Sequence, residues 1–424
     1  MPDTPNSVTS PPKVPPADWL AGGGETAAQR ALKQRYPTAL DLRERARRRL
    51  PRFAFEYLDG GAGSDMGIDR NWAAFDAIEM IPRYGRVVAP PPTDWQLFGR
   101  GYTAPFGISP IGGPGTAFPG AETILARAAQ AARIPYVIGV LSAITIEQAA
   151  ELAPDVLWLQ LYRFAKDGHR IGLDLVRRAA AVGVQALVLT WDTPVRTTRP
   201  REVKSGIVNP FRLTNRLRLD AMTSPSWLIA MMRNGIPRFV SLRPYMDGKT
   251  SFSDTATFMR RESGGAFTWD EIARYRDEWQ GPLLLKGVLH PADAERAVAL
   301  GVDGLHVTNH GGRQVEALPA SIDALPAIAA QVSGKATVIV DSGVRSGVDV
   351  ARAVALGADA AFAGKAFLWS LGALGERGPS HLIDLFVEEF SATLGQLGCA
   401  AVNELHAVTV RHANAYRIED FNCR

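Results

Sequence analysis

The chain has 424 residues, of which 46% are hydrophobic and 21% charged, so it has the composition of a globular protein, long enough for one large barrel or two to three average domains. The formal net charge of +4 is small for this length, and no nucleic-acid partner is expected. The two cysteines, Cys399 and Cys423, lack C-x-x-C spacing, so the sequence predicts no disulfide framework and no zinc or other metal site, and a reducing compartment is the simplest interpretation.

The first part of the chain, residues 1–30, is expected to be a disordered leader. Met1 to about Gly24 is rich in Pro, Gly, Ser and Thr and holds too little apolar surface to offset the entropy of ordering it. It lacks the apolar core of a signal peptide, and no later apolar run approaches the roughly 18 residues of a spanning helix. We therefore expect a cytoplasmic protein, with peripheral contact at the inner face of the membrane left open. Order is expected to begin at Thr38-Ala-Leu-Asp41, followed by a basic helix over Leu42–Leu50.

Eight short apolar runs follow from residue 106 onward, and each is typical of a strand buried on both faces. They are Phe106–Ser109, Tyr136–Val140, Leu157–Leu161, Ala186–Thr190, Leu283–Lys286, Gly304–Thr308, Thr337–Asp341 and Ala360–Ala363. Between them lie alanine-rich segments of helical period: Glu122–Ala132, Ile171–Val182, Asp293–Leu300 and Val348–Leu356, the last three leading into Gly183, Gly301 and Gly357 as helix stops. Strand then helix, repeated eight times, predicts an α/β fold, a (β/α)8 TIM barrel with an N-terminal helical segment, over residues 31–406, with a C-terminal tail over 407–424.

A long insertion is expected after strand four, at about residues 203–267, because about ninety residues separate the fourth and fifth predicted strands. Basic residues surround the apolar stretch Trp227–Met232: Arg212, Arg216, Arg218, Arg233, Arg238 and Arg243. The insertion rejoins the barrel through Thr268-Trp-Asp-Glu271, a capping box that begins a helix. Basic and apolar residues together indicate a membrane surface, and a lid packed on the barrel or on a neighbouring subunit is an equally strong alternative.

Polar residues and glycines concentrate directly after the apolar runs, where the active site of such a barrel lies. They are Pro110 to Gly113, Ser142, Gln160 with Tyr162, Thr190 with Asp192, Lys286, Asn309 to Arg313, Asp341 to Arg345, and Gly364 with Lys365. The last two groups follow strands seven and eight, where barrels commonly hold a phosphate with backbone N–H groups and a cation. A phosphorylated cofactor or substrate is therefore predicted, with ordinary tight turns as the alternative.

His310 and Arg313 lie on one short turn after strand six. An imidazole titrates near neutral pH and a guanidinium can grip a carboxylate with two parallel hydrogen bonds, so together they would bind an acid and take its proton, unless this is only a surface turn. Asp192 would orient His310 and stabilise the imidazolium, or else is a loop residue before Pro194. His306, within the strand, is interpreted as a satisfied core histidine.

Lys286 ends an apolar strand, where an unpaired ammonium is costly, so it is expected to face a negative charge. Contact with a cofactor and Schiff-base chemistry both fit. A barrel enzyme with Lys286 as Schiff-base nucleophile would explain the lysine and the phosphate loops, but it would leave His310, Arg313 and Tyr57 without a role.

Five motifs stand in one order along the chain: Phe55-Glu-Tyr-Leu-Asp-Gly-Gly-Ala62, Leu159-Gln-Leu-Tyr162, Leu189-Thr-Trp-Asp-Thr-Pro194, Leu285-Lys-Gly287 and Thr308-Asn-His-Gly-Gly-Arg-Gln314. With them, the chain from about Leu50 to Leu405 resembles the FMN-dependent L-2-hydroxy-acid oxidases and dehydrogenases, the group of glycolate oxidase, lactate oxidase, lactate dehydrogenase and mandelate dehydrogenase. The resemblance implies FMN as the cofactor and oxidation of a small lactate- or mandelate-like L-2-hydroxy acid to the 2-oxo acid. Electrons would pass to flavin N5 and on to a quinone, a carrier protein or oxygen. It also implies a homotetramer.

The resemblance implies a role for each matching residue. His310 is the base and Asp192 its partner, Arg313 with Tyr57 binds the substrate carboxylate, and Tyr162 and Arg199 contact the substrate from the other side. Lys286 is assigned to the flavin pyrimidine edge, Ser142, Gln160 and Thr190 to the isoalloxazine, and Asp341, Arg345, Gly364 and Lys365 to the ribityl phosphate. Pro110, Ile111, Gly112, Ser342 and Gly343 are also assigned to the cofactor.

Two positions depart from the family pattern. Pro110-Ile111-Gly112 stands where Pro-Thr-Ala is usual, so a hydroxyl near the flavin is missing. Lys365 stands where arginine is usual, which keeps the charge but loses the bidentate fork. These departures predict an altered FMN affinity with binding retained. A non-catalytic FMN-binding barrel is the remaining alternative, for the case in which the departures reflect relaxed function.

Overall fold

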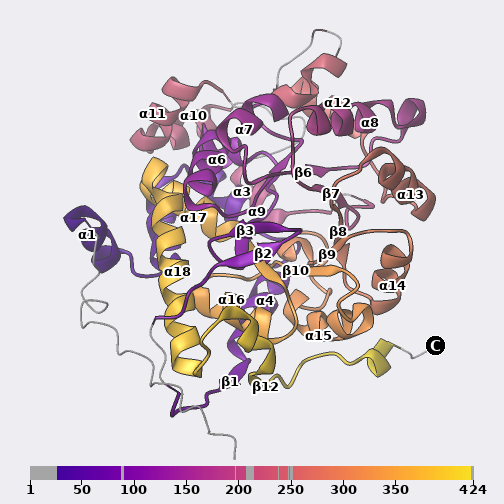
Figure 1. Cartoon of the computed structure of the whole chain (residues 1–424). Helices are drawn as coiled ribbons and strands as arrows, with labels where there is room; N and C mark the ends of the chain where they lie inside the picture. The colour runs from indigo at the N-terminus through magenta and orange to yellow at the C-terminus, as the bar shows by residue number, and fades with distance from the viewer. Residues whose placement is uncertain are drawn as a thin grey trace, which may run out of the picture.

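Eight parallel strands form a closed barrel at the centre of the computed structural model, which describes residues 26–421 except 87–89, 196, 207–213, 237, 247 and 249–251 (Figure 1). The strands are β4 (Phe106–Ile108), β5 (Tyr136–Gly139), β6 (Leu157–Leu161), β7 (Leu187–Thr190), β8 (Leu283–Val288), β9 (Gly304–Val307), β10 (Thr337–Val340) and β11 (Ala360–Ala363). Each strand pairs with the next, and Ala361 of β11 lies opposite Phe106 of β4, which closes the barrel. The eight predicted strands and the (β/α)8 fold are thus confirmed.

Helices surround the barrel because the strands are apolar on both faces and must be covered. They are α5 (Pro114–Ala117), α6 (Ala121–Ala132), α7 (Ile146–Leu152), α8 (Lys166–Ala181), α13 (Trp269–Glu278), α14 (Pro291–Ala299), α15 (Ser321–Val332), α16 (Gly347–Ala355), α17 (Lys365–Leu374) and α18 (Gly378–Leu397). The four predicted helices correspond to α6, α8, α14 and α16. Gly183, Gly301 and Gly357 follow three of them with φ of 76°, 80° and 103°, the left-handed conformation in which glycine ends a helix.

Four helices precede the barrel: α1 (Ala27–Arg35), α2 (Ala39–Arg49), α3 (Arg52–Asp59) and α4 (Met66–Asp76). The predicted basic helix is α2. Helix α1 was not expected, since order was predicted to begin at Thr38; a capping box at Thr26 begins it, and an ion pair between Lys33 and Glu388 ties it to α18. Residues 1–25 of the predicted leader, Arg212 of the insertion and Cys423 lie outside the described residues.

The end of the barrel where the strands begin is covered by the hairpin β2 (Trp95–Leu97) and β3 (Arg100–Tyr102). Phe98 lies in the turn of this hairpin, and its ring centroid is 5.7 Å from that of Trp158, near the start of β6. The predicted C-terminal tail holds β12 (Thr409–Arg411), antiparallel to β1 (Glu79–Ile81), and the short helix η6 (Ile418–Phe421); η4 (Gly375–Arg377) and η5 (Val402–Ala407) lie before it. The opposite end of the barrel is left for the functional site.

The insertion packs on the N-terminal helices. It contains α9 (Pro200–Ser205), α10 (Asn215–Met222), α11 (Pro225–Asn234), η2 (Val240–Tyr245) and α12 (Phe252–Glu262). The carboxylate of Asp220 accepts two backbone N–H groups at the start of α3, both at 3.0 Å, and the ring of Trp227 lies edge-on to Phe53 at 5.5 Å. The predicted capping box of Thr268 and Glu271 begins α13. Nε1 of Trp227 also donates to the carbonyl oxygen of Ala117 in α5, at 3.1 Å, so the alternative of a lid packed on the barrel is supported for this face of the insertion.

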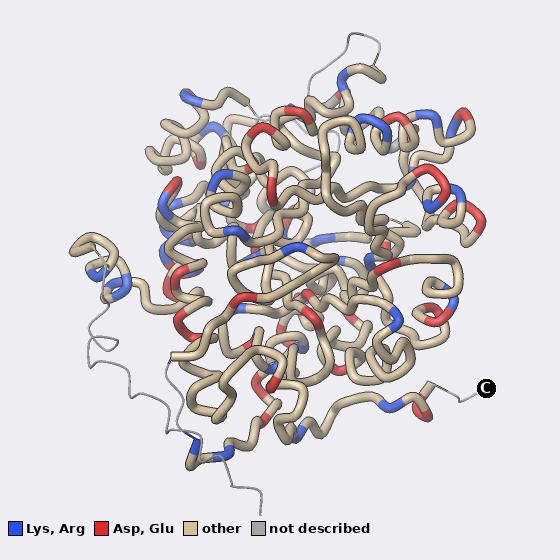
Figure 2. Tube along the Cα trace, in the orientation of Figure 1, with Lys and Arg blue, Asp and Glu red and all other residues tan. Residues whose placement is uncertain are grey.

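Charged residues of both signs are interspersed along the trace, in keeping with the net charge of +4 (Figure 2). Among the helices of the described residues, none has the length and apolar character needed to cross a membrane.

Candidate functional site

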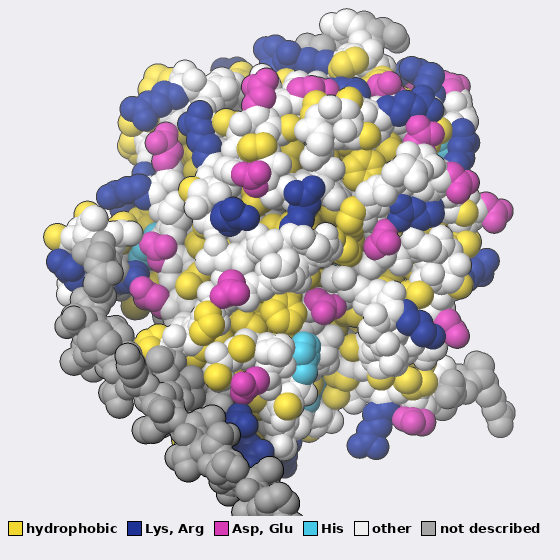
Figure 3. Space-filling model, in the orientation of Figure 1, with side chains coloured by type: hydrophobic (Ala, Val, Ile, Leu, Met, Phe, Trp, Pro, Cys, Tyr) yellow, Lys and Arg dark blue, Asp and Glu magenta, His cyan; other side chains and the backbone are white. Residues whose placement is uncertain are grey.

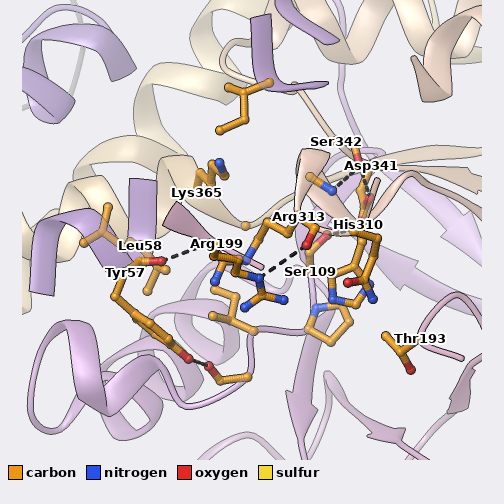
Figure 4. Close-up of a pocket in the computed structure, with 18 of the residues that line it drawn as sticks. Tyr57, Leu58, Ser109, Thr193, Arg199, His310, Arg313, Asp341, Ser342 and Lys365 are labelled. Carbon is orange, nitrogen blue, oxygen red and sulfur yellow. Dashed lines mark hydrogen bonds between the residues drawn. The ribbon is translucent and has the colours of Figure 1, made fainter. Parts of the chain in front are cut away.

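A cavity of about 770 Å³ lies at the end of the barrel where the strands end. Residues at or just after the ends of the barrel strands line it, together with residues of α3, α4 and the insertion, and Figure 4 shows several of them converging. Small-molecule and cofactor sites occupy about 300–1,000 Å³, so this volume suits a cofactor together with a small substrate. The cavity therefore lies where the sequence places the site, at the ends of the strands.

His310 is held by its partner on a tight turn after β9. Its Nδ1 lies 3.0 and 3.1 Å from the two carboxylate oxygens of Asp192. Because a carboxylate only accepts hydrogen bonds, Nδ1 carries the proton and Nε2 is left for a ligand in the cavity. The turn itself, η3 (His310–Gly312), is fixed by two side chains: the His310 N–H donates to Thr308 Oγ1 at 2.9 Å, and the Gly311 N–H donates to Ser342 Oγ at 2.8 Å.

Asp192 reaches His310 because β8 has a bulge beside it. The pairing of β8 with β9 shifts register between Lys286 and Val288, and Gly287 takes a φ of 114°. A Cβ at Gly287 would lie 2.5 Å from the Cβ of Asp192, so only glycine fits. Burial raises the pKa of Asp192, but the charges of His310 and Lys286 outweigh it and hold that pKa below its usual value, so the carboxylate is ionised.

Two guanidinium groups and a carboxylate form a cluster next to this pair. Arg313 donates from Nη1 to the carbonyl oxygens of Tyr57 and Gly60 at 2.9 and 2.7 Å, and from Nη2 to Oε1 of Glu202 at 2.7 Å. Nη1 of Arg199 lies 3.3 Å from the same oxygen of Glu202. Sequence reasoning missed Glu202, although an acidic residue three positions after Arg199 at the start of a helix is a spacing at which side chains meet.

Two tyrosine hydroxyls, those of Tyr57 and Tyr162, lie beside Gly112 in the loop after β4. Tyr57 donates from Oη to the carbonyl oxygen of Gly112, and a Cβ at Gly112 would lie 3.6 Å from Oη of Tyr162. Burial raises the pKa of Tyr57 to about 12 and also raises the pKa of Tyr162, so both phenols stay protonated and can donate to an anion.

Lys286 faces the negative charge that its buried position required. It is 3% exposed, and its Nζ lies 3.6 Å from Oδ2 of Asp341 and donates to Oγ1 of Thr308 at 3.3 Å. Asp341 also accepts from Oγ of Ser109 at 2.9 Å. Thr308 and Ser109 were not predicted as site residues; both stand at strand ends, which was the available signal.

The two predicted phosphate loops both line the cavity. Ser342 and Gly343 have φ of 78° and 109°, and Gly364 immediately precedes α17, so backbone N–H groups gather at this wall.

The two cations of the predicted phosphate site are bound to the protein itself. Nζ of Lys365 donates to the carbonyl oxygens of Asp59 and Gly60 at 2.8 and 3.2 Å, and Arg345 pairs with Asp76 at 2.8 Å. Burial lowers the pKa of Lys365 well below its usual value, with Arg313 adding to the effect. Both side chains line the cavity, and their contact with a phosphate stays a prediction.

Ser142, Gln160 and Thr190 lie beside the cavity rather than on its wall. Gln160 donates from Nε2 to Oγ1 of Thr190 at 2.7 Å, and both are buried. Ser142 borders a smaller pocket together with Ile111 and Glu122. Pro110, Ile111 and Gly112 line the main cavity, as predicted.

A histidine held by a carboxylate, two guanidinium groups and two glycine-containing loops surround one cavity at the end of this barrel. This arrangement is typical of an enzyme that uses a phosphorylated cofactor. The donor set fits FMN: a buried lysine, two glycine-containing loops after β10 and β11, and space beside the histidine.

Comparison with known proteins identifies the class. Residues 46–412 match the family of FMN-dependent dehydrogenases. The chain is 34% identical over 371 residues to an L-lactate dehydrogenase of Pseudomonas syringae pv. syringae (strain B728a), covering 87% of this chain and 97% of the relative, and 37% identical over 372 residues to one of Bartonella quintana (strain Toulouse), covering 87% and 96%.

Solved structures agree. The crystal structure of the monotopic membrane protein (S)-mandelate dehydrogenase has a TM-score of 0.84 at 31% identity and covers 88% of this chain and 99% of its own. Mandelate oxidase has a TM-score of 0.76 at 33% identity, covering 89% and 99%. The chain therefore belongs to the FMN-dependent dehydrogenase family, and it is an FMN-dependent oxidoreductase. The predicted family, cofactor and enzyme class are confirmed, while the cytoplasmic location and the homotetramer stay predictions.

Proposed function

We propose that this protein oxidises an L-2-hydroxy acid to the corresponding 2-oxo acid with His310 as the base. The observation that carries the proposal is one cavity in which an imidazole, fixed through Nδ1 by Asp192 at 3.0 Å, lies with the guanidinium groups of Arg199 and Arg313. A base beside paired cations is what the removal of a proton from a carboxylate-bearing substrate requires. Relatives that carry the names L-lactate dehydrogenase and (S)-mandelate dehydrogenase support the substrate class.

The cations bind and orient the substrate. Its carboxylate docks on Arg313 and Arg199, which share the carboxylate of Glu202, and the Tyr57 hydroxyl supplies a further donor. This places the substrate next to Nε2 of His310, the ring nitrogen that Asp192 leaves available.

His310 then takes a proton from the substrate at Nε2. The resulting imidazolium is stabilised by the ionised Asp192 carboxylate at Nδ1. FMN, when bound, accepts the two electrons of the substrate's α C–H bond. The buried Lys286 and the loops containing Ser342, Gly343 and Gly364 would hold it, with Lys286 supplying positive charge.

We propose further that the substrate has an apolar side chain larger than the methyl group of lactate. A Cβ at Gly113 would lie 3.0 Å from the ring of Phe239 and 3.4 Å from Oη of Tyr57, so Phe239 stands directly beside the carboxylate-binding tyrosine. Leu141 and Met259 line the same cavity. A mandelate-like acid would bury its ring against these residues, worth about 25 cal/mol per Å² of apolar surface.

The test is anaerobic mixing of the purified holoenzyme with L-lactate, glycolate, L-mandelate and longer L-2-hydroxy acids while flavin absorbance is followed. Bleaching by L-mandelate at lower concentrations than by L-lactate, absent in His310→Ala, is expected. A yellow protein that none of these acids bleaches would contradict the function, and equal or better use of L-lactate would contradict only the side-chain proposal. Slow return of colour in air would indicate a dehydrogenase.

We also propose that the insertion contacts a membrane surface, with a quinone as electron acceptor. Leu219, Met222 and Met232 of α10 and α11 are 64, 66 and 74% exposed, whereas Trp227 on the other face of α11 is buried. Hydrophobic and basic side chains lie side by side over these helices at the upper left of Figure 3. An amphipathic surface of this kind binds at the interface of anionic lipid, and a relative in this family carries the description monotopic membrane protein.

Sedimentation with phosphatidylglycerol vesicles tests this second proposal. Wild type is expected to co-sediment, and Met222→Glu/Met232→Glu is expected to stay in the supernatant with unchanged flavin bleaching. Ile81→Glu, an exposed apolar residue on β1, is the matched control and should bind as wild type does. Binding by the double variant would contradict the proposal. A mass measurement on the vesicle-free protein tests the homotetramer.

A further inference from the structure

His306 is a buried titratable residue that the proposed reaction does not use. It lies on β9, opposite Lys286 of β8 in the barrel register, and is 0% exposed. Its ring packs edge-on against Phe362 of β11, with centroids 5.6 Å apart, so the side chain lies inside the barrel below the cavity wall. Burying an imidazole among apolar residues is costly unless a partner offsets it.

The partner of His306 is Asp341. Nε2 of the imidazole lies 3.0 Å from Oδ2 of the carboxylate, but neither ring nitrogen makes a contact with the full geometry of a hydrogen bond among the described residues. The prediction of a core histidine is therefore confirmed, but the prediction that it is satisfied is wrong. The imidazole reaches the carboxylate of Asp341 with one of its two nitrogens.

The same carboxylate oxygen serves Lys286. Oδ2 of Asp341 lies 3.6 Å from Nζ of Lys286 and 2.9 Å from Oγ of Ser109, while the other oxygen accepts from Thr308 and Ser342. His306, Ser109 and Lys286 therefore compete for one acceptor. The 3.6 Å separation is long for an ion pair between groups that are both buried, which leaves the ammonium only partly neutralised.

The charge states favour this competition. Burial lowers the pKa of His306, although Asp341 opposes the shift, so the imidazole is neutral at neutral pH and offers one N–H. Burial raises the pKa of Asp341, but Lys286 and His306 outweigh it and hold that pKa well below its usual value. A neutral donor therefore faces an ionised acceptor.

We propose that His306 is a positioning residue for the flavin: by holding Oδ2 of Asp341 it keeps that carboxylate from pairing tightly with Lys286, and so it sets how much of the lysine charge reaches the cofactor. The inference rests on the proposed placement of the flavin beside Lys286. Without the His306 donor, Asp341 closes on Lys286 and the positive charge at the cavity falls. The reduced, anionic flavin then loses stabilisation and the midpoint potential drops.

The experiment compares the flavin midpoint potentials of wild type, His306→Leu and His306→Gln by equilibration with a reference dye. His306→Leu removes the donor and is expected to shift the two-electron equilibrium about tenfold toward the oxidised flavin, which is about 30 mV. His306→Gln retains an N–H donor and should restore most of that shift. Ser109→Ala, which removes another donor to Oδ2, should lower the potential in the same direction and serves if His306→Leu fails to fold.

Matched controls separate positioning from packing. His381→Leu removes another buried imidazole, one that binds the Tyr36 carbonyl oxygen on the outer helices, and should lower the melting temperature without moving the potential. An unchanged potential in His306→Leu, or an equal shift in His381→Leu, would overturn the inference. FMN binding to the apoprotein, followed by flavin fluorescence, is read in parallel: a wild type that takes up no FMN overturns the flavin site and this inference together, whereas a loaded wild type with the same potential as His306→Leu overturns the inference alone.

Discussion

The pair formed by Asp192 and His310 can be weakened by one nearly isosteric change, Asp192→Asn. The amide oxygen of asparagine can still accept from Nδ1 of His310, so the imidazole keeps its place on the turn, but the negative charge next to it is gone. If Asp192 stabilises the imidazolium that forms in the reaction, the change should slow proton removal and leave substrate binding alone, because Asp192 is not on the cavity wall.

The magnitude follows from the 3.0 Å separation of Nδ1 and Oδ1. At an effective dielectric constant of about 20, two unit charges at this distance attract by about 5–6 kcal/mol. The retained hydrogen bond and relaxation of the site offset part of this, and measured hydrogen bonds to charged groups contribute about 1.5–3 kcal/mol. Taking about 2–3 kcal/mol as the loss in the transition state, kcat should fall about 30- to 150-fold.

Anaerobic stopped-flow measurement of flavin bleaching across substrate concentrations gives kcat and KM separately. The expected result is a lower limiting rate, a KM within about threefold of wild type and full FMN content. Asp323→Asn is the matched control, since Asp323 also lies 3.0 Å from a histidine nitrogen, that of His412, away from the cavity. A limiting rate within threefold of wild type, or an effect carried entirely by KM, would refute the reasoning.

Three further changes test other parts of the site and fold. Arg313→Lys replaces a guanidinium group, which donates to three acceptors, with an ammonium group, which acts as a point charge. The change should raise KM for the hydroxy acid about tenfold or more in steady-state assays, and an unchanged KM would exclude Arg313 from substrate binding. Gly287→Ala puts a Cβ 2.5 Å from that of Asp192 at a φ of 114°, so kcat should fall about tenfold or more while FMN absorbance is kept, and a wild-type rate would show that the bulge yields easily. Glu271→Gln removes a carboxylate whose pKa is lowered from 4.5 to about 2, mainly by its hydrogen bonds from Arg163. Its stabilising effect is present above pH 4.5 and lost as the pH falls toward 2, so the melting temperature of the variant should lie below that of wild type at pH 7 and approach it near pH 3, and a gap that stays constant with pH would contradict this.

The parts of the site that could be predicted are those in which one residue is enough to show the chemistry. Each strand is apolar on both faces, and the carboxyl ends of parallel strands meet at one rim, so polar residues at these ends, such as Lys286 and His310, are expected near one cavity, and both line it. The stop at Gly301 likewise needs only the local rule that glycine adopts the left-handed conformation at a helix end.

The parts that could not be predicted depend on contacts between distant segments. Glu202 is an ordinary helix residue until folding brings Arg313 to it, and the contact of His306 with Asp341 forms only when β9 and β10 pair. Gln160 and Thr190 stand at strand ends as the site residues do, but they bind each other one step away from the cavity wall. Whether a residue at a strand end reaches the cavity wall depends on the register and tilt of its strand. A single sequence motif gives neither.

The closure of the barrel has a consequence for how the protein reaches its native state. One edge of β4, which begins at Phe106, forms its backbone hydrogen bonds with β11, which begins at Ala360. During synthesis, β4 therefore waits with one edge unpaired until most of the chain has left the ribosome, and the apolar strands between them remain only partly covered for the same time. Contacts of such long sequence separation predict slow folding and a need for chaperones. Because residues after β4 and after β11 both line the cavity, the cavity is completed among the last features of the molecule.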